Sequence, residues 1–113
     1  MRTTATGRQA EAAVADYLVD NGFKILAKNW RTRWCEIDII AQKDKIVHFI
    51  EVKYRFSDSQ GSGFEYLTAK KLNQLRFAIN FWAAQNNWTG DCQLLGAEVS
   101  GFEYGIINLV EIE

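Results

Sequence analysis

The sequence predicts an α/β protein in which a mixed β-sheet is sandwiched by helices. Three observations predict this class: helical periodicity in two segments, apolar strand-like segments between and after them, and the resulting element order α, β, β, β, α, β, β. The chain has 113 residues, 48% apolar and 24% charged, an ordinary globular composition that excludes a disordered protein. We expect a single domain over residues 1–113 with one hydrophobic core.

The first helix is expected over residues 7–22, where apolar side chains recur at helical spacing. This stripe consists of Ala10, Val14, Tyr17 and Leu18. Thr6 and Gln9 have the spacing of a capping box, and Asn21-Gly22 is a typical helix end. The segment FKILAKNWR, residues 23–31, follows as a strand because of its aromatic and β-branched content.

A β-hairpin is expected over residues 35–55, where two apolar strands flank a short polar turn. The Gly/Ser-rich segment Phe56–Tyr66 is expected to be a loop, and loops of this length are often functional. Thr68 is expected to cap a second helix that runs to about Asn87. The segments CQLLGAEV and GIINLVEIE are expected to form the last two strands.

The two hairpin strands each carry a carboxylate in apolar surroundings. If Asp44-Lys45 forms a two-residue turn, Asp38 lies directly opposite Glu51. Two like charges in opposed positions, roughly 5 Å apart, destabilise a sheet, and a divalent cation bound by both carboxylates would offset the repulsion. The alternative is a solvated face whose charges Lys53 or Arg55 neutralise.

The same register places Glu36 opposite Lys53, so Glu36 is expected to be a partner of that lysine rather than a second metal ligand. His48, the only histidine, alternates onto the hairpin face opposite Glu51 and is a weak catalytic candidate. The neighbours of the two carboxylates favour the metal interpretation, because buried charges without a role are costly. These neighbours are Ile37, Ile39, Ile40, Val47, Phe49, Ile50 and Val52.

Asp38 followed by Glu51-Val52-Lys53 resembles the acid-then-ExK motif of the PD-(D/E)XK nuclease superfamily. More closely, the blocks GRQAEAAVADYLVDNGFKILAKNWR, EIDIIA, FIEVKYR and TAKKL resemble, in order, those of the YraN-like family of predicted endonucleases, which are related to archaeal Holliday-junction resolvases. The match spans roughly residues 7–83. The resemblance implies a restriction-endonuclease-like core.

The resemblance also implies a catalytic set of Glu11, Asp38, Glu51 and Lys53. Asp38 and Glu51 would bind Mg²⁺ or Mn²⁺, with the backbone carbonyl of Val52 as a third ligand. Lys53 would position the attacking water or stabilise charge on the phosphate. Glu11, from the first helix, would complete the metal's shell directly or through water, although its position at the edge of the apolar stripe also fits a solvated side chain.

The candidate nucleic-acid contacts are Arg31, Arg33, Arg55, Lys70 and Lys71. The alternative for each is an exposed side chain that only faces solvent, as most Lys and Arg side chains do. Trp30 and Trp34 flank the first two, and such aromatics either stack on unpaired bases or belong to a core or interface. Residues 1–90 carry 13 Lys and Arg against 9 Asp and Glu, whereas residues 91–113 carry none against 5. With a net charge of −1, affinity for a polyanion must come from a local groove.

The second helix has two apolar stripes, one of Leu72, Leu75, Ile79 and Trp82 and another of Phe77 and Phe81. One sheet cannot cover both, so either a homodimer forms through this helix or the C-terminal strands bury the second stripe. The two cysteines, Cys35 and Cys92, are expected to be free thiols. Without an apolar run near the roughly 18 residues of a membrane span, we expect no membrane partner and a cytoplasmic location.

The sequence therefore predicts a Mg²⁺- or Mn²⁺-dependent endonuclease that cuts DNA, with structured or branched DNA as the expected substrate. Two other classes of function are alternatives. The first is a non-catalytic nuclease-fold module that binds nucleic acid or a protein partner, and the second is a purely protein-binding dimeric domain. Salt dependence distinguishes the last from the others, because only nucleic-acid affinity falls steeply with salt.

Overall fold

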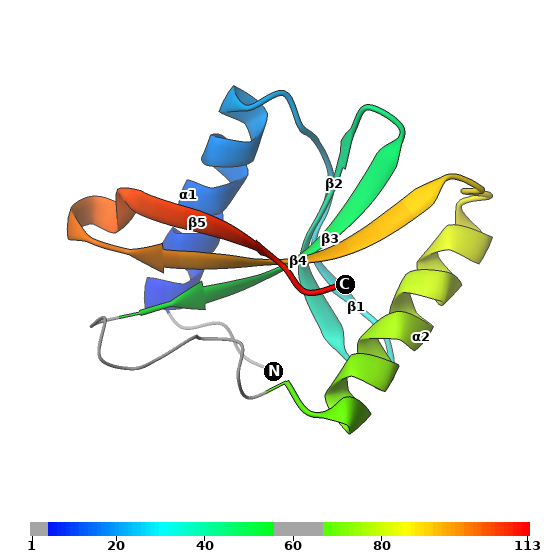
Figure 1. The fold of residues 1–113 in the computed structure, drawn as a ribbon. Helices are drawn as coiled ribbons and strands as arrows, with labels where there is room; N and C mark the ends of the chain where they lie inside the picture. Colours follow the sequence, from blue (N-terminus) through cyan, green and yellow to red (C-terminus); the bar gives the residue numbers. More distant parts are fainter. Residues whose placement is uncertain (1–4, 56–66) are drawn as a thin grey trace.

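The computed structural model describes residues 5–55 and 67–113, and the expected loop Phe56–Tyr66 lies outside this part of the chain. The elements are α1 (Ala5–Asp20), β1 (Lys24–Arg31), β2 (Glu36–Lys43), β3 (Ile46–Tyr54), α2 (Ala69–Gln85), β4 (Asp91–Ser100), the short 3₁₀-helix η2 (Phe102–Tyr104) and β5 (Ile106–Glu111) (Figure 1). The predicted order of helices and strands is confirmed. Neither α-helix of the described residues is long and apolar enough to cross a membrane.

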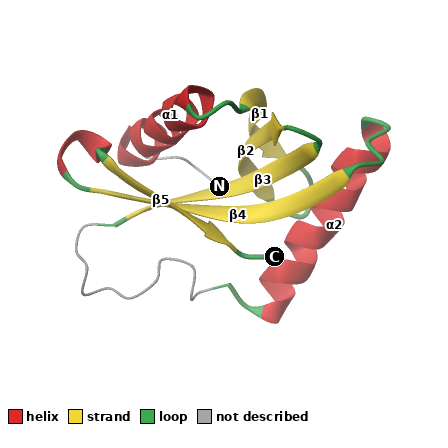
Figure 2. Cartoon of the chain, turned by 45° about the horizontal axis from the view of Figure 1, so that its top comes forward, coloured by secondary structure: helices red, strands yellow, loops and turns green. Residues whose placement is uncertain are grey.

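The five strands form one mixed sheet in the order β1-β2-β3-β4-β5. β3 and β4 are parallel and are joined by a crossover that contains α2, whereas the other three pairs are antiparallel. The helices α1 and α2 pack on opposite faces of the sheet (Figure 2). The predicted fold class, a mixed sheet sandwiched by helices, is confirmed.

The expected single core is divided by the sheet into two clusters. One cluster joins α1 to side chains such as Ile39, Ile50 and Ala97, and the other joins α2 to side chains such as Ile40 and Phe49. A central sheet buries both of its faces, so neighbouring residues of β2 and β3 alternate between the two clusters. Both central strands therefore read as nearly continuous apolar sequence.

The helix ends agree only in part with the sequence prediction. Thr68 caps α2, because its hydroxyl oxygen accepts a hydrogen bond from the Lys71 amide at 3.1 Å. In contrast, α1 begins at Ala5, so Thr6 lies inside the helix and the predicted cap is wrong. The predicted end is confirmed, since Gly22 follows α1 with a φ of +90°.

The helix stripes are confirmed at most positions. In α1, Ala10, Val14 and Leu18 are buried, but Tyr17 is exposed and Ala15 takes its place in the core. In α2, Leu75 and Trp82 are buried, and Leu72 and Ile79 are partly buried beside them. The prediction for the second stripe needs a correction: the C-terminal strands do not bury Phe77 and Phe81, which are 56% and 38% exposed.

We predict that Phe49→Ala lowers the free energy of unfolding by about 3 kcal/mol, measured by urea denaturation. Phe49 is fully buried and its ring makes an edge contact with Trp82 across the α2 cluster, 5.5 Å between centroids. The matched control is Phe102→Ala, which removes a ring that is 89% exposed and is expected to cost less than about 0.5 kcal/mol. Equal losses in both variants would contradict the placement of the core.

Candidate active site

The carboxylates of Asp38 and Glu51 lie where the ladder between β2 and β3 ends. The two strands pair from Lys43 with Ile46 to Ile39 with Ile50, which confirms Asp44-Lys45 as the two-residue turn. One residue further on, the carboxylate of Asp38 accepts a hydrogen bond from the Val52 amide at 2.7 Å. A side chain thus takes the role of a backbone acceptor at this point, and the opposed positions of Asp38 and Glu51 remain adjacent.

Among the ion pairs between described residues, the predicted pair of Glu36 and Lys53 is not found. Because the β2–β3 ladder ends at Ile39 and Ile50, Glu36 pairs instead with its neighbour on β1, Arg31, whose Nε lies 3.0 Å from Glu36 Oε2. Lys53 is exposed on β3, two residues beyond Glu51 and therefore on the same face of the strand.

Both central carboxylates are buried, which contradicts the alternative of a solvated face. Asp38 is 6% exposed and Glu51 is 8% exposed. Glu51 Oε1 and Glu36 Oε1 are also buried and accept a hydrogen bond from no group that the structure describes. A buried carboxylate oxygen without a donor is costly, so these atoms are suited to a cation.

The burial of these carboxyl groups favours their neutral form in the absence of a cation. Burial, and then repulsion from Asp38, raises the pKa of Glu51 to about 8. Burial also raises the pKa of Asp38 to about 6, against the opposing effect of the Val52 hydrogen bond. Near neutral pH Glu51 is therefore largely protonated, and full ionisation of the site needs a compensating cation.

Glu11 joins the site from α1, as the resemblance implied. Its carboxyl group interacts with Asp38 and with the side chain of Asn29. Burial, and then the charge of Asp38, raises the pKa of Glu11 to about 7, whereas the Asn29 side chain lowers it. The Glu11 side chain, at the edge of the apolar stripe of α1, therefore interacts with the site and is not merely solvated.

Asn29 is a site residue that the sequence analysis missed. It lies within β1, where Asn is disfavoured, and its φ of +50° is left-handed. The irregular backbone accompanies a shift in register between Ile25 and Ala27 on the same strand. An Asn in a strand was the available signal, but it did not reveal that the side chain contacts Glu11.

Lys71 approaches the carboxylates from the first turn of α2. Its charge lowers the pKa of Glu51 and of Asp38, although less than burial raises them. Lys71 and Glu51 line one pocket of about 300 Å³ whose other lining residues come from the β1–β2 connection. The full lining consists of Arg31, Thr32, Arg33, Trp34, Cys35, Glu36, Glu51 and Lys71.

The predicted nucleic-acid contacts divide into two groups. Arg31, Arg33 and Lys71 line the pocket with Glu51, and Lys70 lines an adjacent shallow pocket on α2. Arg55 lines neither and instead forms an ion pair with Glu98 of β4, 3.2 Å between Nη1 and Oε2. Three of the five predicted contacts therefore line the pocket of the candidate active site, and Lys70 lines a second pocket that shares Trp34 with it.

Two further predictions concern residues beside the site. His48 lies on the α1 face of the sheet against Phe23, 5.0 Å between ring centroids, which confirms its position on the face opposite Glu51. Its pKa is lowered by burial. Cys35 and Cys92 are free thiols, as expected.

The donor set fits a hydrated Mg²⁺ or Mn²⁺ better than a metal enclosed entirely by protein. In the described residues no three Asp, Glu, His or Cys side chains are arranged to hold one ion. Mg²⁺ commonly takes one or two carboxylates and fills its other positions with water and phosphate oxygens, which Asp38 and Glu51 satisfy. Of the two roles implied for Glu11, this favours contact with the metal through water.

The fold and the site together define a class of protein. It is an α/β protein with a five-stranded mixed sheet between two helices, consistent with a restriction-endonuclease-like core, and its buried carboxyl groups lie beside a pocket that is lined with cations. More specifically, the chain belongs to the family described as Uncharacterised protein family UPF0102, which matches residues 10–103. This match confirms the resemblance to the YraN-like family.

Three relatives illustrate the similarity. The chain is 41% identical over 91 residues to a UPF0102 protein of Sulfurihydrogenibium sp., covering 80% of this chain and 78% of the relative. It is 44% identical over 87 residues to a UPF0102 protein of Nitratiruptor sp., covering 76% and 74%. It is 40% identical over 88 residues to a UPF0102 protein of Campylobacter jejuni, covering 78% and 77%.

We predict that, with EDTA present, the stability of the protein falls between about pH 5 and pH 8. The folded-state pKa of Glu51, about 8, lies above the ordinary value of 4.5, so the folded state binds the proton more tightly and loses this advantage as pH rises. Glu51→Gln keeps a neutral side chain, and its decline over this range, measured by urea denaturation, should be smaller by roughly 1–2 kcal/mol.

The matched control for this measurement is Glu111→Gln, which makes the same change at an exposed position on β5. Its stability should follow the pH dependence of the unmodified protein. A decline in Glu51→Gln as steep as in the control would show that Glu51 is ionised at little cost.

Proposed function

We propose that this protein is a metal-dependent endonuclease that hydrolyses phosphodiester bonds in DNA, with structured or branched DNA as its substrate. One observation carries the proposal: the buried carboxylate of Glu51, which has an oxygen that no described donor satisfies, lines a pocket together with Arg31, Arg33 and Lys71. Asp38 is buried close enough to Glu51 for its charge to raise the pKa of Glu51. Buried anions suit a metal ion and the surrounding cations suit phosphates, so the two sets of charge serve one reaction.

The residues divide the work of hydrolysis. Asp38 and Glu51 would hold Mg²⁺ or Mn²⁺, with the carbonyl of Val52 as a further ligand, and the bound ion would supply a Lewis acid and an activated water. Lys53 holds the attacking water or stabilises the charge that develops on the phosphate. Glu11, which interacts with Asp38, would orient this carboxylate and would contact the metal through water.

The choice of DNA rests on local charge and on the family resemblance. The net charge of −1 excludes binding through bulk attraction, whereas cations concentrated beside the carboxylates can hold the phosphates next to the scissile bond. Branched DNA is proposed as the substrate because the family resembles the Holliday-junction resolvases. A homodimer through α2, which would present two sites to a four-way junction, and a cytoplasmic location remain predictions that accompany this function.

The alternative function is a nuclease-fold module that binds nucleic acid without cleaving it. The specific observation in its favour is that no three acidic, His or Cys side chains in the described ranges form a metal cluster. Under this alternative the cations of the pocket still bind phosphates and the carboxyl groups remain largely protonated. The two functions differ in their response to metal and in cleavage.

We predict that 10 mM Mg²⁺ or 1 mM Mn²⁺ raises the melting temperature by about 5 °C, because an ion that binds only the folded state stabilises it. Differential scanning fluorimetry with and without EDTA measures the shift. Asp38→Asn should abolish the shift, whereas Asp16→Asn, the same change at an exposed position of α1, should retain it. An equal shift in Asp38→Asn would remove the metal site from the proposal.

We predict that the protein cleaves at least one member of a DNA panel in Mn²⁺, and that Lys53→Ala reduces the rate by about 100-fold or more. The panel contains a single strand, a duplex, a flap and a four-way junction. DNA binding by Lys53→Ala should stay within about threefold of the unmodified protein, because the exposed lysine is assigned to chemistry.

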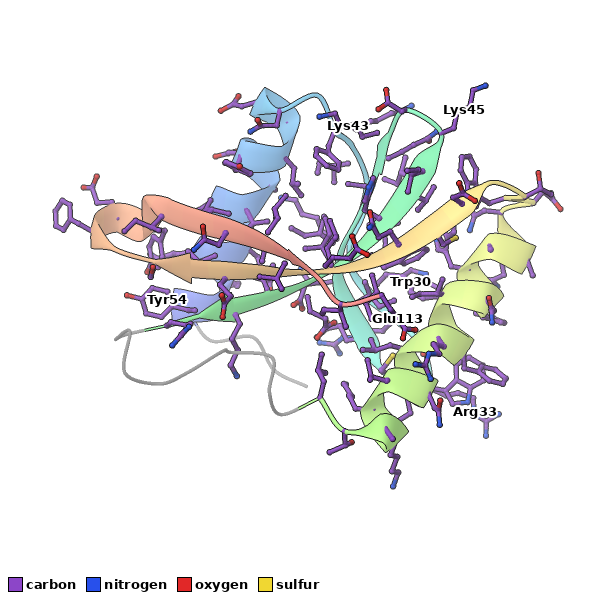
Figure 3. All side chains as sticks on the ribbon, in the orientation of Figure 1. Trp30, Arg33, Lys43, Lys45, Tyr54 and Glu113 are labelled. Carbon is purple, nitrogen blue, oxygen red and sulfur yellow. The ribbon has the colours of Figure 1, made fainter. Side chains whose placement is uncertain are left out.

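The matched control is Lys45→Ala at the hairpin turn, which Figure 3 shows at the end of the sheet away from Arg33. This variant should cleave at the normal rate. Loss of both binding and cleavage in Lys53→Ala would assign the lysine to recognition, and binding without cleavage by the unmodified protein would favour the non-catalytic module.

A further inference from the structure

Four aromatic rings form a cluster beside the pocket, between the β1–β2 connection and the outer side of α2. The Trp34 ring contacts Phe77 at 4.4 Å and Phe81 at 5.4 Å between centroids, and Trp30 lies 6.3 Å from Phe81. Despite these contacts, Phe77 remains 56% exposed and Phe81 38% exposed. We call this cluster of Trp30, Trp34, Phe77 and Phe81 the aromatic platform.

Trp34 connects the aromatic platform to the candidate active site. It lines the pocket of about 300 Å³ that contains Glu51 and Lys71. It also lines an open pocket of about 500 Å³ together with Lys70, Asn73, Gln74 and Phe77. The two pockets therefore meet at one indole ring, and a chain molecule that occupies both would pass from the carboxylates onto exposed aromatic surface.

The turn that carries Trp34 is fixed by its own hydrogen bonds. The hydroxyl oxygen of Thr32 accepts hydrogen bonds from the Trp34 amide at 3.0 Å and the Cys35 amide at 3.1 Å. The Thr32 amide in turn donates to the Cys35 carbonyl at 2.9 Å. A ring held on such a turn loses little conformational freedom on binding, so the indole is preorganised for a ligand.

The charges around the platform indicate the kind of ligand. Arg33 is exposed next to Trp34, and Lys70 is exposed in the first turn of α2 beside Phe77. Figure 3 shows Trp30 and Arg33 on the side of the sheet that carries α2. Exposed aromatic rings next to cations match a ligand with both flat apolar rings and phosphates, which is an unpaired strand of nucleic acid.

The same charges disfavour a second copy of this chain as the occupant. A twofold dimer brings one patch against the identical patch of its partner, so Arg33 and Lys70 would face their own copies or each other across the interface. Like charges in such an interface are costly unless acids intervene. The acids near the platform, Glu36 and Glu51, are buried in the active-site pocket rather than exposed on α2.

We infer that Trp34 and Phe77 stack an unpaired nucleobase in the single-stranded DNA that flanks the phosphate at the active-site pocket. This inference deepens the proposed function, on which it rests for the position of the cleaved bond, and it gives the enzyme a preference for substrates with an unpaired segment. Stacking itself needs neither metal nor cleavage, so binding and cleavage test the two proposals separately.

The test is fluorescence anisotropy with a labelled 12-nucleotide oligo-dT and a blunt duplex of the same length, in EDTA. We predict that Phe77→Ala and Trp34→Leu each weaken binding of the single strand by about tenfold, because stacking contributes substantially for each base. Duplex affinity should change less than threefold. The matched control is Phe102→Ala, an exposed ring on η2, which should leave both affinities unchanged.

Two outcomes would overturn the inference. The first is a loss of no more than threefold for the single strand in Phe77→Ala, whose exposed ring can be removed without disturbing the core. The second is a dimer in sedimentation velocity that Phe77→Ala converts to a monomer, since the platform would then be an interface between copies. Failure of the proposed function differs from both: the single strand would bind through the platform, and no DNA of the panel would be cut in Mn²⁺.

Discussion

The hydrogen bond from the Val52 amide to the Asp38 carboxylate, 2.7 Å long, links the two central strands where their backbone ladder ends. Because a side chain accepts the bond that a backbone carbonyl would otherwise accept, Asp38 stays buried and Glu51 is enclosed next to it. The position lies between the two layers of helices, so α1 supplies Glu11 from one direction and α2 supplies Lys71 from the other. All the groups of the site depend on this end of the ladder.

The site has too few positively charged groups to neutralise its carboxylates. This imbalance gives it the capacity to bind a cation. Burial raises the pKa values of Glu11, Asp38 and Glu51, and Lys71 offsets this effect only in part at Asp38 and Glu51, while Arg31 is engaged with Glu36. Ionisation of a buried carboxyl group lowers the stability of the folded protein. Proteins tolerate this loss of stability chiefly at functional sites. The cost in stability and the capacity to bind a cation therefore have the same origin, the burial of these carboxyl groups.

The sequence predicted those parts of the fold that depend on local pattern. Alternation and periodicity gave the order of elements, and the two-residue turn gave the register that opposes Asp38 and Glu51. The sequence-based prediction was wrong or incomplete where tertiary structure determines the partner of a side chain. Glu36 pairs with Arg31 of β1 because the ladder between β2 and β3 ends early. Asn29 interacts with Glu11 from an irregular part of β1 that hydrophobic periodicity does not reveal. Likewise, the apolar pattern of α2 could not show that Trp34, from the connection between β1 and β2, contacts Phe77.

A crystal structure of the protein with Mn²⁺ tests the central claim most directly, because anomalous scattering locates the ion without reference to activity. We predict one anomalous peak between Asp38 and Glu51, with an oxygen of each carboxylate bound to the ion and water in the remaining positions. The peak should be absent in Asp38→Asn crystals. Two buried carboxylates with no peak between them at saturating Mn²⁺, or a peak that persists in the variant, would show that Asp38 and Glu51 do not form a metal site.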